Sequence, residues 1–388
     1  MAQDNEEFTV RLSIEDGSES FPQKEIGFCV RDSIYSPFPE IEVVYADITG
    51  LALEYGAFIQ GVKMHLSYGE QENLMDLIFR SIERNTVKAT GSRPQLSGVL
   101  KVRGVHESYF DDRGNPKKSF TKKTVTDVVK DLFPAEADID IESTQGKVNL
   151  YAFGDPYEFV NSIKDLATTG KIDQFVFFRD LKKQLHFCSL NHLLDGSSVA
   201  TFELKAVFDP KDEEQNIITG FLPFNEKGDK VYPYMRVLGK FLSNELELKT
   251  EEASIAKDAK DTIPFVSENE IDNDVYFGRQ FNPDIEYEIL NKGLESASLK
   301  FILDKAVCII PFNVDCIAGK TVDLKINVLS PESNEELSEY YSGTWLIEQS
   351  FHSWAGDSQR STTKLILCRK SVKPVHNSAL NSKAFKDK

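Results

Sequence analysis

The stretch GTWLIEQSFHSWAGDSQRSTTKLILCRK, Gly343 to Lys370, holds two apolar, β-prone runs separated by a polar loop. Such a pair of runs predicts the closing hairpin of a β-domain. Alternate residues of a strand share a face, so the first run should be half-buried, with its apolar side chains Trp345, Ile347 and Phe351 together on one face. That face must be covered, either by the core of its own domain or by another copy of the chain.

Polar residues of the same stretch include His352, Ser353 and Asp357, the residue types of a catalytic triad. Adjacent strand residues point to opposite faces, so His352 and Ser353 should not reach one cleft. No G-x-S-x-G motif lies nearby, and the paired acids elsewhere, Asp111–Asp112 and Glu213–Glu214, stand in turn-like sequence. The sequence therefore predicts no catalytic residues, no enzyme activity and no cofactor.

Length, composition and net charge narrow the possible classes of protein further. The chain has 388 residues, enough for about two or three domains. No apolar run approaches the roughly 20 residues of a membrane-spanning helix, so stable membrane insertion is not expected. The net charge of −17 repels phosphate, which argues against tight binding of nucleic acid.

Cysteine and histidine usage predicts no metal site. Five cysteines are scattered singly, and several lie in apolar runs, as reduced core residues do: Cys29, Cys188, Cys308, Cys316 and Cys368. An odd, unclustered set fits neither a disulfide framework nor a zinc site built from close pairs. Histidines such as His186 and His192 are isolated in sequence, and we interpret them as core or surface residues.

The residue pattern, and with it the predicted secondary structure, changes along the chain. Short β-prone runs divided by Gly, Pro, Asn and Ser clusters dominate residues 1–105 and return after residue 200. Between them, residues 106–200 predict a small α+β domain with a helix over 124–133, a second helix capped by Asp155, and a hairpin over 174–190. Residues 245–300 are acidic and poor in strand pattern, which indicates an inserted mixed domain.

The expected fold class is mainly β, and α+β overall. Two similar antiparallel β-barrel domains, 1–105 and 201–244 with 301–370, are accompanied by smaller mixed α/β domains, and the second barrel is interrupted by the insertion. An internal echo favours duplication, because SGVLKVRGVHESYF at Ser97 can be laid over SGTWLIEQSFHSWA at Ser342. Residues 371–388 form a basic tail, which is either a docking arm or a solvated end.

One segment carries a family resemblance. VRDSIYSPFPEIEVVYADITG, residues 30–50, resembles the first-domain signature of the baseplate hub protein of contractile-tailed phages. In that family an Arg-Asp-Ser-hydrophobic-Tyr box leads into a strand, and here the box is Arg31, Asp32, Ser33, Ile34 and Tyr35. The hairpin over 343–370 and the segment DPYEFVNSIKDLATTGKIDQFVFF are similar to later parts of the hub. Late control protein D of other phages and the hub of type VI secretion share this plan, but nothing aligns over 245–300.

The resemblance implies a structural protein of the virion, placed in the baseplate of the tail and assembled in the host cytoplasm. Three copies with two β-barrels each would form a pseudo-sixfold ring that joins the tail tube to the spike and lets DNA pass without specific binding. The partners would be the tail-tube protein, the spike protein, with or without a lytic domain, and other baseplate proteins. The interface candidates are Trp345, Ile347, Phe351, Arg369, Lys370 and Lys373.

A carbohydrate-binding or cell-wall-cleaving tail protein is the alternative function. An aromatic patch on an exposed loop would favour glycan binding, and a pair of acids in a groove would favour cleavage. The sequence shows neither clearly.

Overall fold

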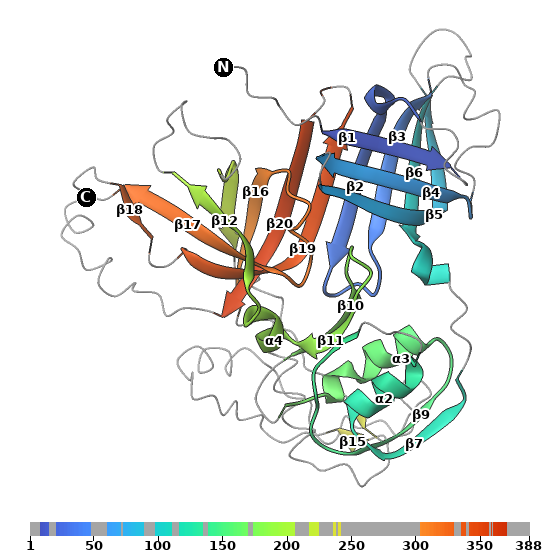
Figure 1. Cartoon of the computed structure of the whole chain (residues 1–388). Helices are drawn as coiled ribbons and strands as arrows, with labels where there is room; N and C mark the ends of the chain where they lie inside the picture. Colours follow the sequence, from blue (N-terminus) through green and yellow to red (C-terminus); the bar gives the residue numbers. More distant parts are fainter. Residues whose placement is uncertain are drawn as a thin grey trace.

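Figure 1 shows a computed structural model in which two β-rich parts lie side by side above a smaller part that carries the helices. The structure describes the following residues: 8–14, 21–47, 60–70, 73–88, 98–110, 116–134, 139–169, 174–205, 217–224, 236–237, 240–241, 303–329, 335–338, 341–356, 358 and 360–370. The expected insertion at 245–300 and the basic tail at 371–388 lie outside these residues.

The first β-part is a curved antiparallel sheet in the order β1-β4-β5-β6-β3-β2. Its strands are β1 Thr9–Ile14, β2 Ile26–Ser33, β3 Glu40–Asp47, β4 Lys63–Glu70, β5 Asn73–Lys88 and β6 Gly98–His106. Alternate residues along each strand turn inward, so that the sheet wraps around its own core, which includes Leu12, Val30, Val43, Leu66, Phe79 and Val102. The β-prone runs of residues 1–105 thus form the strands that their period-2 pattern predicts.

The α+β part follows. It contains β7 Lys118–Lys123, α2 Val125–Leu132, β8 Ile139–Ile141, β9 Val148–Ala152, α3 Pro156–Ile163, β10 Phe175–Arg179, β11 Leu185–Ser189 and α4 Leu190–Leu194. Both predicted helix starts are confirmed. The Thr124 side chain caps α2 in a capping box with Asp127, and the Asp155 carboxylate accepts hydrogen bonds from the backbone N–H groups at the start of α3.

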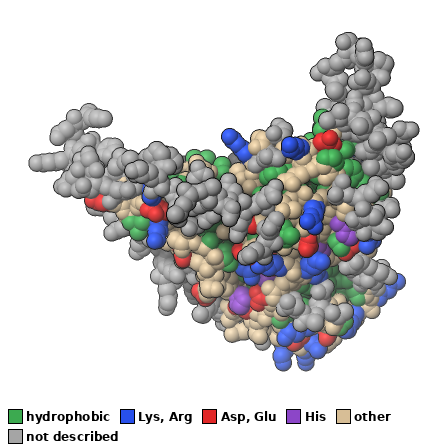
Figure 2. Space-filling model, turned by 45° about the horizontal axis from the view of Figure 1, so that its top comes forward, with side chains coloured by type: hydrophobic (Ala, Val, Ile, Leu, Met, Phe, Trp, Pro, Cys, Tyr) green, Lys and Arg blue, Asp and Glu red, His purple; other side chains and the backbone are tan. Residues whose placement is uncertain are grey.

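A lysine-rich stretch departs from expectation. The polar, turn-rich sequence FDDRGNPKKSFTKK of residues 110–123 predicts an exposed loop, but Lys118–Lys123 is strand β7, paired with β9. The buried side chain of Phe120 explains why a strand forms here, because its ring packs in the core that α2 and α3 also line. The neighbouring lysines stay on the surface, and Lys and Arg side chains gather at this lower end of the molecule in Figure 2.

The second β-part uses strands from both sides of residues 242–302. They are β12 Ser198–Leu204, β13 Gly220–Phe224, β16 Leu303–Pro311, β17 Thr321–Leu329, β18 Glu335–Leu337, β19 Gly343–Ala355 and β20 Arg360–Lys370. The predicted hairpin over 343–370 is β19 and β20, paired antiparallel. A short separate hairpin joins β14 Arg236–Val237 to β15 Lys240–Phe241. The mainly β fold with large antiparallel sheets is therefore confirmed.

Two connections depart from a simple antiparallel pattern. β12 spans the boundary expected at residue 200 and runs parallel to β17. β19 pairs with β17 through its first residues and with β2 through its last, so that the two β-parts share one 13-stranded sheet. Among the described residues, no helix has the length and apolar character to cross a membrane.

Candidate functional site

The site on which the architecture depends is the point where β19 passes from one β-part to the other. Residues Gly343–Leu346 lie opposite β17, and residues Gln349–Ala355 lie opposite β2. Between these halves Glu348 is an extra residue, because Ile347 pairs with Leu367 and Gln349 with Ile366 on β20. A β-bulge of this kind reverses which face each later residue presents.

The bulge overturns one expectation. Trp345 and Ile347 face inward, but Phe351 lies opposite Lys364 on the outer face and does not share their face as predicted. The residues that continue the inner face are Ser350, His352 and Trp354. The physical reason is the single inserted residue: in a strand of period 2, one extra residue exchanges the faces of all residues after it.

Glu348 lies at the bulge in a buried ion pair. Its carboxylate is 3.1 Å from the Lys305 ammonium of β16, and the exposed fractions of the two side chains are 1% and 7%. The Tyr35 hydroxyl donates to the same carboxylate at 2.8 Å, and the Ile34 N–H donates to the Glu348 carbonyl at 3.0 Å. The family-like box and the last β-hairpin are therefore joined by charge-assisted hydrogen bonds.

Asp32 of the box is equally buried, and it has no cation as a hydrogen-bond partner among the described contacts. Its carboxyl accepts a hydrogen bond from the Ala318 N–H at 3.1 Å. Burial, reinforced by the nearby Asp180 carboxylate, raises the pKa of Asp32 to about 8, although backbone hydrogen bonds oppose the rise. At neutral pH the group is thus mainly the neutral acid, which can stay in a dry interior without a counter-ion.

Ile34 occupies the centre of the contact between the three parts. It lies in a buried cluster with residues of the α+β part, the loop before β17, and the β19–β20 hairpin: Val176, Phe178, Cys188, Leu190, Leu193, Ala318, Leu346 and Cys368. Ser33 accepts a hydrogen bond from the Tyr35 N–H at 3.2 Å and shapes the turn after β2. Arg31 stays outside, where it donates to Gln349 at 3.2 Å. The residues of the family-like box therefore lie where the three parts of the molecule meet.

His352 is a core residue. Its Nε2–H donates to the Cys316 carbonyl at 3.1 Å, so Nδ1 is the atom that accepts from the Tyr68 hydroxyl at 2.9 Å. Burial lowers the pKa of His352 to about 4, so the ring is neutral at pH 7. Ser353 points to the opposite face, as predicted, and Asp357 lies outside the described residues.

The remaining interface candidates fall into two groups. Trp345 and Ile347 are fully buried in the core of the second β-part, so of the two coverings left open by the sequence the structure shows the chain's own core. Arg369 is also internal: its guanidinium stands 4.3 Å from the centroid of the Trp345 ring and donates to the Ser342 carbonyl at 3.0 Å. Lys370 ends β20, and Lys373 lies outside the described residues.

Phe351 belongs to an apolar strip on the outer face of the sheet. The pairing register puts five residues from four adjacent strands on this face: Leu222, Val307, Ile309, Ile366 and Phe351. Leu222 is 65% exposed and Ile309 is 38% exposed. The cations of Arg31 and Lys364 stand 5.9 and 5.5 Å from the centroid of the Phe351 ring. We call these five residues the outer strip.

Sequence reasoning missed Glu348 and its partner Lys305. One signal was present, because Trp345, Leu346 and Ile347 are three consecutive apolar residues where strict alternation would place a polar one. A break in alternation next to a charged residue is how a bulge appears in sequence. The partner Lys305 lies in another strand and carries no such mark.

The sequence matches no protein-family model and no curated protein. Solved structures do match. A tail protein from Neisseria meningitidis MC58 aligns at a TM-score of 0.54 with 11% identity, over 93% of this chain and 96% of that one. The 43 kDa tail protein of prophage MuSo2 from Shewanella oneidensis aligns at 0.50 with 12% identity over the same shares. A type VI secretion component from E. coli reaches 0.47 with 9% identity, over 95% of this chain and 77% of that one, a similarity too low to carry an argument.

At this level of identity the similarity concerns the fold, and it extends over nearly the whole length of both tail proteins. The resemblance to a phage tail hub noted in the box at 31–35 is confirmed at that level. The chain has the fold of phage tail proteins.

Proposed function

We propose that this protein is the central hub of a contractile phage baseplate, a homotrimer that joins the tail tube to the spike. The observation that carries the proposal is the match to two phage tail proteins over 93% of the chain. A shared domain alone would leave a large part of one chain unmatched, and here both chains are almost fully covered. The role is structural and not enzymatic, and no cofactor takes part.

The outer strip supports assembly of copies. Among the described strands, β13 pairs with β16 alone, and no described strand covers its other edge, where a strand of a neighbour could pair. Of the large apolar side chains that the structure describes, Leu222 on this edge strand is the most exposed, at 65%. An apolar strip that ends at an open strand edge is typical of a subunit contact. One surface that recognises a different surface on an identical copy produces a closed ring when the rotation closes.

The two β-parts support the pseudo-sixfold arrangement. Three copies would place six β-parts around one axis, which suits a sixfold tube on one side and a threefold spike on the other. Because β19 belongs to both β-parts, their relative orientation is fixed within each copy. The net charge of −17 favours passage of DNA without binding. The protein would be part of the virion and would assemble in the host cytoplasm, with tube, spike and other baseplate proteins as partners.

Light scattering tests the proposal. A trimer of 43.8 kDa chains weighs three times that mass, or 131.4 kDa, and the protein alone or with its spike should give this value or a multiple of it. Micromolar protein is needed, since a ring dissociates on dilution. A chain that stays at 43.8 kDa with tube and spike proteins present would overturn the proposal. Binding of that monomer to cell-wall glycan would then favour the carbohydrate-binding alternative.

A further inference from the structure

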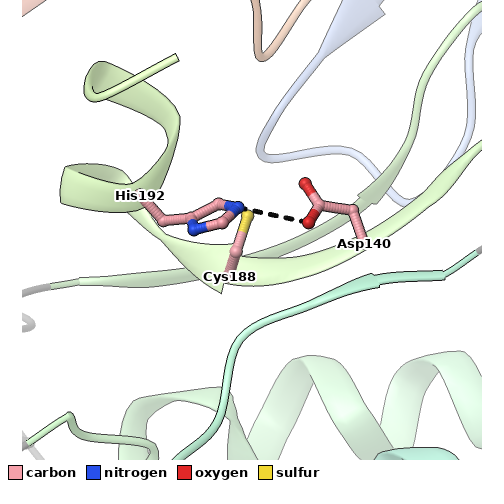
Figure 3. A group of neighbouring side chains, drawn as sticks. All are labelled: Asp140, Cys188 and His192. Carbon is pink, nitrogen blue, oxygen red and sulfur yellow. Dashed lines mark hydrogen bonds and ion pairs between the residues drawn. The ribbon is translucent and has the colours of Figure 1, made fainter.

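A cluster of potential metal ligands lies on the α+β part, away from the outer strip. Asp140 on β8, Cys188 on β11 and His192 on α4 each offer one ligand atom, and these atoms all lie within 4.8 Å of one another. Figure 3 shows the three side chains converging, with the Cys188 sulfur beside the imidazole and the Asp140 carboxylate facing it. No sequence pattern joins them, because Asp140 lies far from the other two residues along the chain.

The backbone explains the convergence. β8 runs parallel to β11, and Asp140 lies opposite His186. His186 and Cys188 are two positions apart on β11, so they point to the same side, the side of Asp140. Ser189 then caps α4, whose first turn carries His192 back over the end of β11.

The distance between two of the three ligand atoms fits a tetrahedral ion, and the third ligand atom lies within 4.8 Å of both. Zinc bonds of roughly 2.0–2.3 Å at tetrahedral angles place pairs of ligand atoms roughly 3.3–3.6 Å apart. His192 Nε2 and an Asp140 oxygen are 3.2 Å apart, already joined by a hydrogen bond. Both atoms could therefore bind one ion with only small movements, the proton on Nε2 being transferred to Nδ1.

A second layer of contacts holds the Asp140 carboxylate in place. Its other oxygen is 3.0 Å from Nδ1 of His186, whose Nε2 is 3.1 Å from the buried Asp180 carboxylate. His186 is therefore held between the two carboxylates. Ligating carboxylates are commonly fixed by such outer hydrogen bonds.

We propose that Asp140, Cys188 and His192 bind one zinc ion, with the fourth position open to solvent. The thiol of Cys188 loses its proton on binding, and thiolate with imidazole selects zinc over magnesium or calcium. His192 is 43% exposed, which gives the ion a path from solvent, while Cys188 is fully buried beneath it. The ion would tie β8, β11 and α4 together. The proposal is independent of the hub function.

The test uses the full-length protein after removal of metal with a chelator. One zinc per chain should rebind, measured by mass spectrometry of the metal content after gel filtration. Cobalt(II) should give a thiolate-to-metal charge-transfer band. His192→Ala should weaken zinc binding roughly 100-fold or more, and Asp180→Asn, which changes the carboxylate behind His186 and none of the three ligands, should weaken it roughly 10- to 100-fold.

Two controls make the test decisive. His65→Ala removes a partly buried histidine on β4, and Cys316→Ser changes a buried thiol in another core, so neither should alter zinc affinity. Cys188→Ser should abolish the cobalt band. If that variant does not fold, the zinc affinity of His192→Ala decides the test, because this variant changes an exposed side chain. Absence of the band from the wild-type protein, or wild-type zinc affinity in His192→Ala, overturns the proposal.

Discussion

Replacing Glu348 with Gln should destabilise the whole molecule, because the change leaves a buried ammonium without its carboxylate. Gln keeps the size of the side chain and an oxygen for the Tyr35 hydroxyl, but Lys305, 3.1 Å away and 7% exposed, loses its counter-charge. Breaking a buried ion pair from one side costs about 3–5 kcal/mol. At about 2.1 cal/mol/K of unfolding entropy per residue, 388 residues give about 0.8 kcal/mol per degree, so about 4 kcal/mol lowers Tm by about 5 °C if the chain unfolds as one unit.

The assay can use the protein's own fluorescence. The chain has two tryptophans, Trp345 and Trp354, and both lie on β19, one in each β-core and on either side of Glu348. Urea unfolding of the Trp354→Phe variant reports the second core, and that of Trp345→Phe reports the first. Because one strand joins the cores, the change at Glu348 should shift both signals together.

A double-mutant cycle separates charge from packing. Lys305→Met should also cost about 3–5 kcal/mol, but Glu348→Gln with Lys305→Met should cost clearly less than the sum, since no unpaired charge remains. The surface pair of Lys101 and Glu42, 2.8 Å apart with side chains 42% and 41% exposed, is the matched control, and Glu42→Gln should cost less than about 1 kcal/mol. Additive costs, or a cost for Glu348→Gln no larger than that for Glu42→Gln, would refute the reasoning.

Further outcomes follow from the same contacts. Stability should fall as the pH drops from 6.5 to 4, by up to about 1.4 kcal/mol per unit for each of His106 and His352, because burial lowers the pKa of both rings to about 4 and only the unfolded rings take up protons in that window; the raised pKa of Asp32 offsets the fall of one of them, and a flat profile in urea titrations would contradict this. Between pH 6.5 and 8 the wild type should lose stability as the pH rises, since Asp32, with its pKa raised to about 8, keeps a proton that the unfolded chain has lost; Asp32→Asn should reduce that slope, leaving the part that comes from the raised pKa of His186, and an unchanged slope would argue against it. Leu222→Glu on the outer strip should shift the mass by light scattering from 131.4 kDa towards 43.8 kDa, whereas Leu337→Glu, 54% exposed on β18, should not; equal effects would place the contact elsewhere.

Local rules predicted much of this fold. The cap at Asp155, the β-runs of the first hundred residues and the hairpin over 343–370 each depend on neighbours within a few positions, so the sequence displays them directly. The sequence pattern does not predict the strand at Lys118–Lys123, because the stretch is rich in lysine and contains a single buried ring, that of Phe120.

The junction depends on long-range contacts. The sequence marks Asp32 only as part of a signature, and the Ala318 N–H that donates to its buried carboxyl lies 286 positions away. The bulge at Glu348 moved Phe351 to the outer face, a change of one residue that periodicity alone cannot locate. The cluster of Asp140, Cys188 and His192 likewise exists only because β8 joins β11 in parallel.

Because β19 belongs to both β-parts, strand β2 has to wait for its partner strand until the ribosome has made β19. Arg31 of β2 meets Gln349 of β19 across 318 positions of sequence. At about 5–20 residues per second, the ribosome needs about 16 to 64 s to add that length. During this interval the β2 edge is made but its partner is not, and an unpaired edge readily joins the same edge of another nascent chain. A chain interrupted before residue 355 would never pass that stage, so intact synthesis to the end of β19 is a condition for a soluble product.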